Sequence, residues 1–154
     1  MLTVMLIQFD KCRSCLSPHG QMTSIKTTGC SKQKTFHSNS SVCHLKMGDT
    51  VTVRMKFVPN TRVHSLKVRC TGKVHGHSFD VPIPQENVCG NYDNFICPIN
   101  TGESRDFTIK IPVRYDGPIP SKNMKNVPVT FQLTLEDESH NDVACKKLQA
   151  KICG

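Results

Sequence analysis

The residues of this sequence best suited to covalent chemistry are its cysteines, of which there are nine in 154 residues. Cys15 follows the first apolar stretch, and Cys145 lies inside the last one. Four others stand in two local pairs that each enclose a polar loop: Cys30 and Cys43, and Cys89 and Cys97. One long-range pair with two local pairs is typical of a secreted domain stabilised by disulfides. Metal ligation and scattered buried thiols are the alternatives.

The remaining candidates for metal binding and catalysis are weak. His75-Gly76-His77 would place two imidazoles on one face of a strand, but a zinc site needs further ligands. Cys12-Arg13-Ser14-Cys15 has the spacing of a redox or zinc motif, without a second such motif or a following helix. The sequence also lacks a nucleophile elbow, a His-Glu-x-x-His motif and a P-loop. We therefore expect no enzymatic activity, no metal and no cofactor.

Alternating apolar and polar positions predict the elements that hold these residues, because such alternation is typical of half-buried β-strands. The clearest segments are 51–57, 66–74, 79–83, 107–113 and 127–136, of which the third is expected to continue the second beyond a short kink. Turn-forming residues separate the others, and no segment favours a helix. The acidic residues 136–138 are expected to form a solvated loop. About six to eight short strands, each with one apolar face that is expected to be buried, predict an all-β, antiparallel two-sheet sandwich.

The second of these segments carries two unusual residue types on its apolar face. Cys70 alternates with Leu66 and Val68, so we expect it to be a buried free thiol that packs as a small hydrophobic residue. Gly72 and Gly76 interrupt the same stretch. Ordinary packing or a bulge explains them more simply than a cavity does.

Composition limits the class of protein. No linker-like shift divides the chain, so we expect residues 1–154 to form one domain. The apolar residues 1–7 lack the basic flank and the length of a signal peptide and are expected to form a first strand. The net charge of +8 favours anionic surfaces, whereas two Tyr and no Trp argue against a nucleic-acid partner. Asn39-Ser40-Ser41 is a glycosylation sequon, which is consistent with secretion.

Several short motifs follow one another in a characteristic order. They are Phe9-Asp10-Lys11, Cys15-Leu16-Ser17, the segment from Cys43 to Gly48, Val81-Pro82-Ile83-Pro84, Cys97-Pro98-Ile99 and Val143-Ala144-Cys145. In this order and spacing the chain resembles the ML lipid-recognition domain family, whose members include sterol-transfer proteins, mite allergens and arthropod lipid carriers. Leu16 departs from the family pattern, which has Gly here, and the loop from Cys30 to Cys43 is longer than usual.

The resemblance implies an immunoglobulin-like β-sandwich with a lipid cavity between its two sheets. It also implies three disulfides, which are Cys15–Cys145, Cys30–Cys43 and Cys89–Cys97. The extra cysteines Cys12 and Cys153 flank the long-range pair, so we expect a fourth bridge between them. A monomer in extracellular fluid or in the lysosomal lumen is the implied state.

The resemblance further implies a ligand site on the dry faces of the strands. The residues expected to line it are Met55, Val68, Phe79, Val81, Ile111, Val113, Tyr115, Ile119, Val129 and Phe131. Val81 stands where some sterol carriers have Phe, so a fatty acid fits at least as well as a sterol. The implied function is a soluble carrier of one sterol, fatty acid or related lipid, with an anionic membrane surface or a lipid receptor as its partner. The alternatives are an immune module that presents microbial lipid to a receptor, and an adhesion sandwich with a solid core.

Overall fold

The computed structural model describes residues 15, 17–29, 33–35, 41–92, 95–114 and 127–153. These residues form nine β-strands: β1 (Gly20–Thr28), β2 (Gln33–Thr35), β3 (Ser41–Lys46), β4 (Thr50–Pro59), β5 (Lys67–Val74), β6 (His77–Val81), β7 (Arg105–Pro112), β8 (Pro128–Glu136) and β9 (Asp142–Cys153). The described part of the chain contains no helix, and hence none that could span a membrane. The all-β prediction is confirmed.

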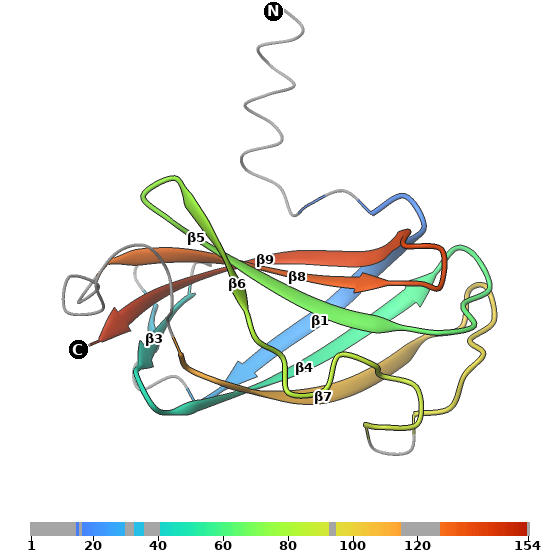
Figure 1. The fold of residues 1–154 in the computed structure, drawn as a ribbon, viewed down its shortest axis with the longest axis horizontal. Coiled ribbons are helices and arrows are strands. Elements are labelled where there is room, and N and C mark those ends of the chain that lie inside the picture. Colours follow the sequence, from blue (N-terminus) through green and yellow to red (C-terminus); the bar gives the residue numbers. More distant parts are fainter. Residues whose placement is uncertain are drawn as a thin grey trace, which may run out of the picture.

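The strands form two sheets that face each other as a sandwich (Figure 1). One sheet has the order β1-β4-β7, and the other has the order β2-β3-β9-β8-β5-β6. All pairs are antiparallel except β3 with β9, which run parallel. The predicted antiparallel two-sheet sandwich is confirmed, with this one parallel pair in addition. A tight turn at Gly48 (φ 91°) sends the chain from β3 into the other sheet, so β3 pairs with the end of β9 instead of with its own successor.

The alternation in the sequence marks the inner faces of the sheets correctly. On β4 the side chains of Val53, Met55 and Phe57 are buried, whereas Arg54 and Lys56 are exposed. The same alternation holds along β5, where Val68, Cys70, Gly72 and Val74 are buried. Burial of these apolar faces, at about 25 cal/mol per Å², is the main force that holds the two sheets together.

A hairpin replaces the kink that the sequence predicted between residues 74 and 79. The turn consists of His75 (φ 48°) and Gly76 (φ 80°), and β6 folds back antiparallel to β5 beyond it. Two successive positive φ angles close a two-residue hairpin, which explains the glycine. This turn lies at the upper left of Figure 1. His75 is thus in the turn and His77 on the strand, and the predicted pair of imidazoles on one strand face is wrong.

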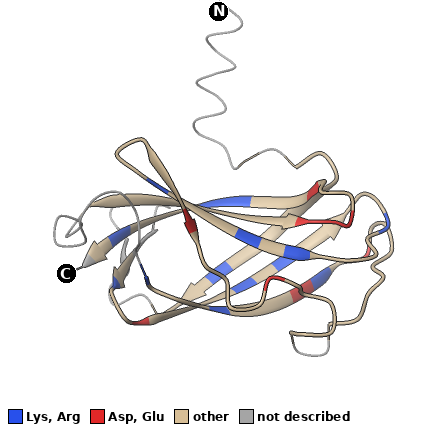
Figure 2. Cartoon of the chain, viewed as in Figure 1, with Lys and Arg blue, Asp and Glu red and all other residues tan. Residues whose placement is uncertain are grey.

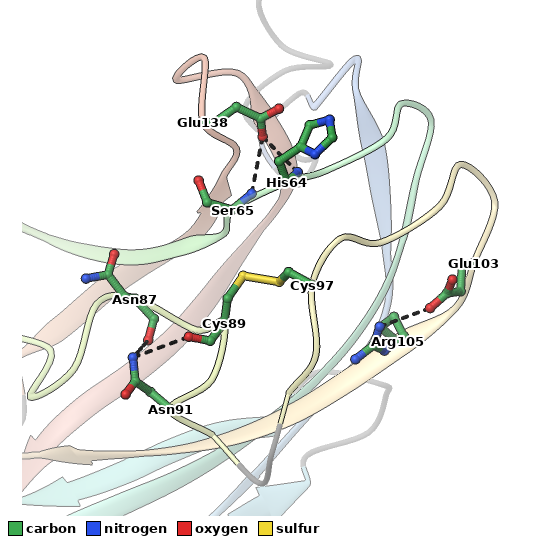
Figure 3. The surroundings of a disulfide bond; sticks show 9 residues. All are labelled: His64, Ser65, Asn87, Cys89, Asn91, Cys97, Glu103, Arg105 and Glu138. Carbon is green, nitrogen blue, oxygen red and sulfur yellow. Dashed lines mark hydrogen bonds and ion pairs between the residues drawn. A yellow bond between two sulfur atoms is a disulfide. The ribbon is translucent and has the colours of Figure 1, made fainter.

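Two disulfides join segments at the same end of the sandwich. Cys15 and Cys145 are bonded across 130 residues, with their Cα atoms 5.5 Å apart. Cys89 and Cys97 are bonded across 8 residues, with a Cα distance of 5.7 Å (Figure 3). Both predicted bridges are confirmed. The predicted bridges Cys30–Cys43 and Cys12–Cys153, the first strand at residues 1–7 and the sequon at Asn39 fall outside the described residues and side chains.

Of the three acidic residues predicted to form a solvated loop at the end of β8, Glu136 and Asp137 are buried and Glu138 is exposed. Glu136 is 9% exposed and Asp137 is 7% exposed. Glu136 lies on the same face of β8 as Thr134, the residue opposite Arg69, and Arg69 Nη1 lies 3.1 Å from Glu136 Oε2. Asp137 Oδ1 accepts hydrogen bonds of 2.9 Å from the backbone N–H groups of Ser139 and Asn141. The prediction failed for Glu136 because its partner Arg69 is distant in sequence.

Candidate functional site

The sandwich is closed at the end that carries the disulfides. Val63, Val88 and Ile99 are completely buried there. The backbones of Val63 and Ile99 exchange two hydrogen bonds, of 2.9 Å and 2.8 Å, which join the segment after β4 to the segment before β7. A site for a molecule between the sheets must therefore lie farther along the strands.

Burial of the inward side chains changes from one cross-strand row to the next along the six-stranded sheet. Val68, Leu135 and Ala144 lie opposite one another in register and are completely buried. Two rows farther from the closed end, the register aligns Phe79, Gly72, Phe131 and Leu148 across β6, β5, β8 and β9. In this second set, named here the aromatic row, the three side chains other than Gly72 are only partly buried. The aromatic row is thus a place where solvent reaches the apolar interior.

The geometry of the aromatic row depends on its glycine. A Cβ atom at Gly72 would lie 2.3 Å from Cζ of Phe79, so the Phe79 ring occupies the space above the Gly72 backbone. The ring centroids of Phe79 and Phe131 are 6.5 Å apart, with an interplanar angle of 84°. This edge-to-face arrangement is favourable for aromatic rings. The glycine therefore serves packing, as the sequence suggested, and its space is filled by a neighbouring ring.

The predicted lining residues that the structure describes all belong to one hydrophobic cluster. Met55, Val68 and Val129 are completely buried or nearly so, Val81 and Val113 are 8% and 9% exposed, and Phe79, Ile111 and Phe131 are partly buried. Tyr115 and Ile119 lie outside the described residues. Met55, Val68 and Val129 are thus inaccessible to solvent, whereas the side chains of Phe79, Ile111 and Phe131 are partly accessible to it. Ligand contact remains a prediction for each of these residues.

Val113 is fixed by its backbone just beyond the end of β7. Its N–H donates to the carbonyl oxygen of Asp49 at 2.7 Å, and its carbonyl accepts from the N–H of Gly48 at 3.1 Å. These bonds tie the end of β7 to the turn between β3 and β4 and keep the Val113 side chain in the interior cluster. A substitution of the Val113 side chain therefore changes the interior of the sandwich and leaves these backbone hydrogen bonds in place.

Cys70 lies in the wall of the same interior. In register it is opposite Val81 on one side and Leu133 on the other, and it forms no disulfide. Burial raises the pKa of the Cys70 thiol to about 12, so it stays neutral at physiological pH. A neutral thiol is a poor nucleophile. The prediction of a buried free thiol is confirmed, and the wall here offers apolar contact.

Two side chains of β9 on this inner face were not predicted from the sequence. Leu148 completes the aromatic row, and Lys146 lies opposite the buried Leu133 one row nearer the closed end. The apolar alternation of Leu148, Ala150 and Ile152 was the signal for this face. The adjacent lysines 146 and 147 obscured it, because a charged side chain is not expected on an inner face.

The family comparison matches the ML domain over residues 7–152. Mite group 2 allergen Lep d 2 from Lepidoglyphus destructor is 28% identical over 136 residues, which cover 87% of this chain and 82% of the allergen. NPC intracellular cholesterol transporter 2 from Bos taurus is 23% identical over 142 residues, covering 92% and 84% of the two chains. The ecdysteroid-regulated 16 kDa protein of Manduca sexta is 27% identical over 118 residues, covering 74% of this chain and 72% of its own.

A solved structure shares the fold. The Niemann-Pick type C2 protein from the Japanese carpenter ant superimposes with a TM-score of 0.70 at 19% identity, covering 91% of this chain and 97% of its own. The similarity thus extends across both sheets. Because the family model matches nearly the whole length, the chain belongs to the ML domain family.

Proposed function

We propose that this protein binds one hydrophobic molecule, a sterol, fatty acid or related lipid, between its two sheets and carries it through water. The observation that supports this most directly is the aromatic row, where Phe79, Phe131 and Leu148 face the interior yet remain partly exposed. A lipid that covers these large apolar side chains removes their exposed surface from water, which makes the free energy of binding more favourable. Each 100 Å² of apolar surface removed from water contributes about 2.5 kcal/mol.

The relatives support the same class of ligand. One similar protein is named as a cholesterol transporter, and another bears the name of a Niemann-Pick type C2 protein. No covalent step is needed for carriage. Carriage requires only a mostly apolar site with a few polar groups that orient the ligand.

We propose a secreted or lysosomal location for this carrier. The disulfides Cys15–Cys145 and Cys89–Cys97 support it, because such bonds form and persist in oxidising compartments. The relatives include a mite allergen.

We propose that anionic membranes attract the loaded carrier. Lys and Arg residues lie on strands of both sheets (Figure 2). On the outer face of the three-stranded sheet, Lys26 lies directly opposite Arg54, and Lys56 follows two residues farther along. A shallow depression of about 320 Å³ lies among these cations, Ser24 and Asp106. Lipid transfer to vesicles should then accelerate with anionic lipid content and slow with salt. Transfer rates insensitive to both would exclude this docking.

Direct extraction tests the carrier function. The purified protein is extracted with organic solvent, the extract is analysed by mass spectrometry, and the delipidated protein is titrated with a fluorescent fatty acid and a fluorescent sterol. We expect a co-purified lipid, or saturable binding of one probe that unlabelled lipid displaces. An empty extract together with no displaceable binding of either probe would show that the sandwich is not a lipid carrier.

A further inference from the structure

A single lysine lies on the inner face of β9. Leu133 and Lys146 are opposite each other in the antiparallel pair of β8 and β9, and residues opposite each other project from the same face of a sheet. Leu133 is 1% exposed and therefore marks the inner face. The residues two positions before and after Lys146, which are Ala144 and Leu148, belong to the same face and to the hydrophobic cluster.

The neighbouring lysine provides the contrast. Lys147 pairs with Gln132, points to the opposite face and is exposed, whereas Lys146 is partly buried. A strand turns successive side chains to opposite faces, so these two adjacent residues of the same type differ only in which side of the sheet they occupy.

No described carboxylate neutralises Lys146. The ion pairs among the described residues involve Arg54, Arg69, Arg105 and His140, and none involves this ammonium group. The other cation that β8 or β9 offers near this row, Lys147, lies on the far side of the sheet. A partly buried lysine on an apolar face without a described counter-ion favours an anionic ligand, because opposite charges attract more strongly beside an apolar surface than in bulk water.

The distance across the sheet fits an extended chain. Lys146 is on β9 and Phe79 is on β6, three strands away in the order β9-β8-β5-β6. Neighbouring strands are about 4.8 Å apart, so about 14 Å of apolar surface separates them. The aromatic row, one row beyond Lys146, provides that surface. A flexible acyl chain can lie along it with a charged head at the β9 side.

We propose that Lys146 binds the carboxylate of a fatty acid whose acyl chain lies along the aromatic row. The ammonium group donates hydrogen bonds to the carboxylate oxygens, and Phe131 and Phe79 cover the chain. The ligand class is therefore an anionic single-chain lipid and not a neutral sterol. This inference depends on the proposed carrier function and adds to it the chemistry of the head group.

The test compares ligands that share one chain and differ in the head group. Palmitic acid and hexadecanol are titrated as competitors of a fluorescent fatty acid against the delipidated protein, its Lys146→Met variant and its Lys147→Met variant. Lys146→Met should weaken binding of the acid about tenfold or more and leave the alcohol within about twofold. Lys147→Met removes the same charge from the outer face and should change neither. Lys146→Arg should retain binding of the acid.

The outcomes separate the inference from the proposed function. If the protein binds acid and alcohol equally and Lys146→Met changes neither, the head-group role is wrong while the carrier function stands. If Lys147→Met weakens acid binding as much as Lys146→Met, the effect comes from net charge and the inference is again wrong. If the protein binds no lipid probe at all, the carrier function itself fails. Circular dichroism and thermal unfolding verify that each variant is folded, and Lys146→Gln replaces Lys146→Met if the latter is not.

Discussion

The ring of Phe79 on β6 lies over the backbone of Gly72 on β5, where a Cβ atom would approach Cζ of the ring to 2.3 Å. Because β5 offers no side chain at this point, Phe79 extends across it and meets Phe131 of β8 edge-on. An aromatic surface thereby continues over three strands. The close approach of the ring is the reason for the glycine. Backbone conformation is not, because the φ of Gly72 lies outside the left-handed region that favours glycine.

Gly72→Ala should displace Phe79 and destabilise the protein. The added methyl carbon would lie 2.3 to 2.8 Å from three ring atoms of Phe79, so the ring must move away from Phe131. We expect a loss of about 1–3 kcal/mol in the free energy of unfolding, measured by urea denaturation. Affinity for a fluorescent fatty acid should fall as well, because the aromatic row is interrupted.

A double-mutant cycle distinguishes this contact from a general effect of alanine in a strand. In the Phe79→Ala background the ring is absent, so Gly72→Ala should cost much less than in the wild type. Equal costs in both backgrounds would show that the ring of Phe79 is not what excludes a side chain at position 72.

Val113→Asp should prevent lipid binding. The side chain belongs to the interior cluster and is 9% exposed, so a carboxylate there places a charge against the apolar chain of the ligand. The backbone bonds of Val113 to Gly48 and Asp49 do not depend on its side chain and should persist. Displacement of a fluorescent lipid measures the loss.

Val58→Asp is the matched control for Val113→Asp. Val58 lies on β4 between the buried residues Phe57 and Pro59, so it faces the outside of the three-stranded sheet. The same substitution there should leave lipid binding unchanged. Equal loss of binding in both variants would indicate general damage, and retention in both would remove Val113 from the site.

The periodicity of the sequence predicts which side chains face inward but not how strands are paired. Residues 51–57 alternate so regularly that one face of β4 follows directly from the hydrophobic effect. The parallel pairing of β3 with β9 depends on contacts between residues about a hundred positions apart, which no local pattern encodes. The hairpin at His75 was missed because a kink and a two-residue turn use the same residue types.

The candidate site shows the same division. Phe79 and Phe131 could be named from their alternation, whereas their contact needs the absence of a side chain at Gly72 and the register that aligns all three. The alternation of Leu148, Ala150 and Ile152 places Lys146 on their face, but a lysine is not expected on an inner face. The pairing of β9 with β8 shows that Lys146 lies inside and Lys147 outside.

Removal of the long-range disulfide should destabilise the protein more than removal of the short one. The Cys15–Cys145 bond joins residues separated by 130 positions, for which loop-closure entropy predicts about 5 kcal/mol. The Cys89–Cys97 bond has a sequence separation of 8, for which the same relation predicts about 2.5 kcal/mol. Serine replacement of both cysteines of each pair, followed by thermal unfolding, measures the difference. A larger loss for the Cys89–Cys97 pair would show that local packing outweighs chain entropy. If the long-range variant does not fold while the other does, the predicted order also holds.

Cys70 should resist alkylation in the native protein. Its thiol is buried and its pKa is raised to about 12 by that burial, so the thiolate is scarce and shielded at pH of about 8. Iodoacetamide treatment followed by peptide mass spectrometry should find Cys70 unmodified under native conditions and modified in urea. Rapid native modification would place this thiol at the surface, and the wall of the interior would have to be assigned differently.

Two carboxyl groups near the turn between β8 and β9 should make opposite contributions to the pH dependence of stability. Burial and the neighbouring Glu136 carboxylate raise the pKa of Asp142, although Arg69 and His19 oppose the shift. Burial also acts to raise the pKa of Glu138, but hydrogen bonds from backbone N–H groups, including those of His64 and Ser65 in Figure 3, lower it overall.

The sign of each effect follows from proton binding. With its raised pKa, Asp142 holds its proton more tightly in the folded state, so its ionisation destabilises the fold as pH rises through that range. Asp142→Asn should therefore raise the melting temperature at about pH 7 and lose this advantage at about pH 3, where both states are protonated. Glu138 is stabilising when ionised, so Glu138→Gln should lower the melting temperature at neutral pH, with a difference that shrinks as the pH falls. Thermal unfolding of the three proteins across this pH range measures both curves. If the two variants shift the melting temperature in the same direction at neutral pH, the pKa values of Asp142 and Glu138 are not shifted in opposite directions, and this interpretation is wrong.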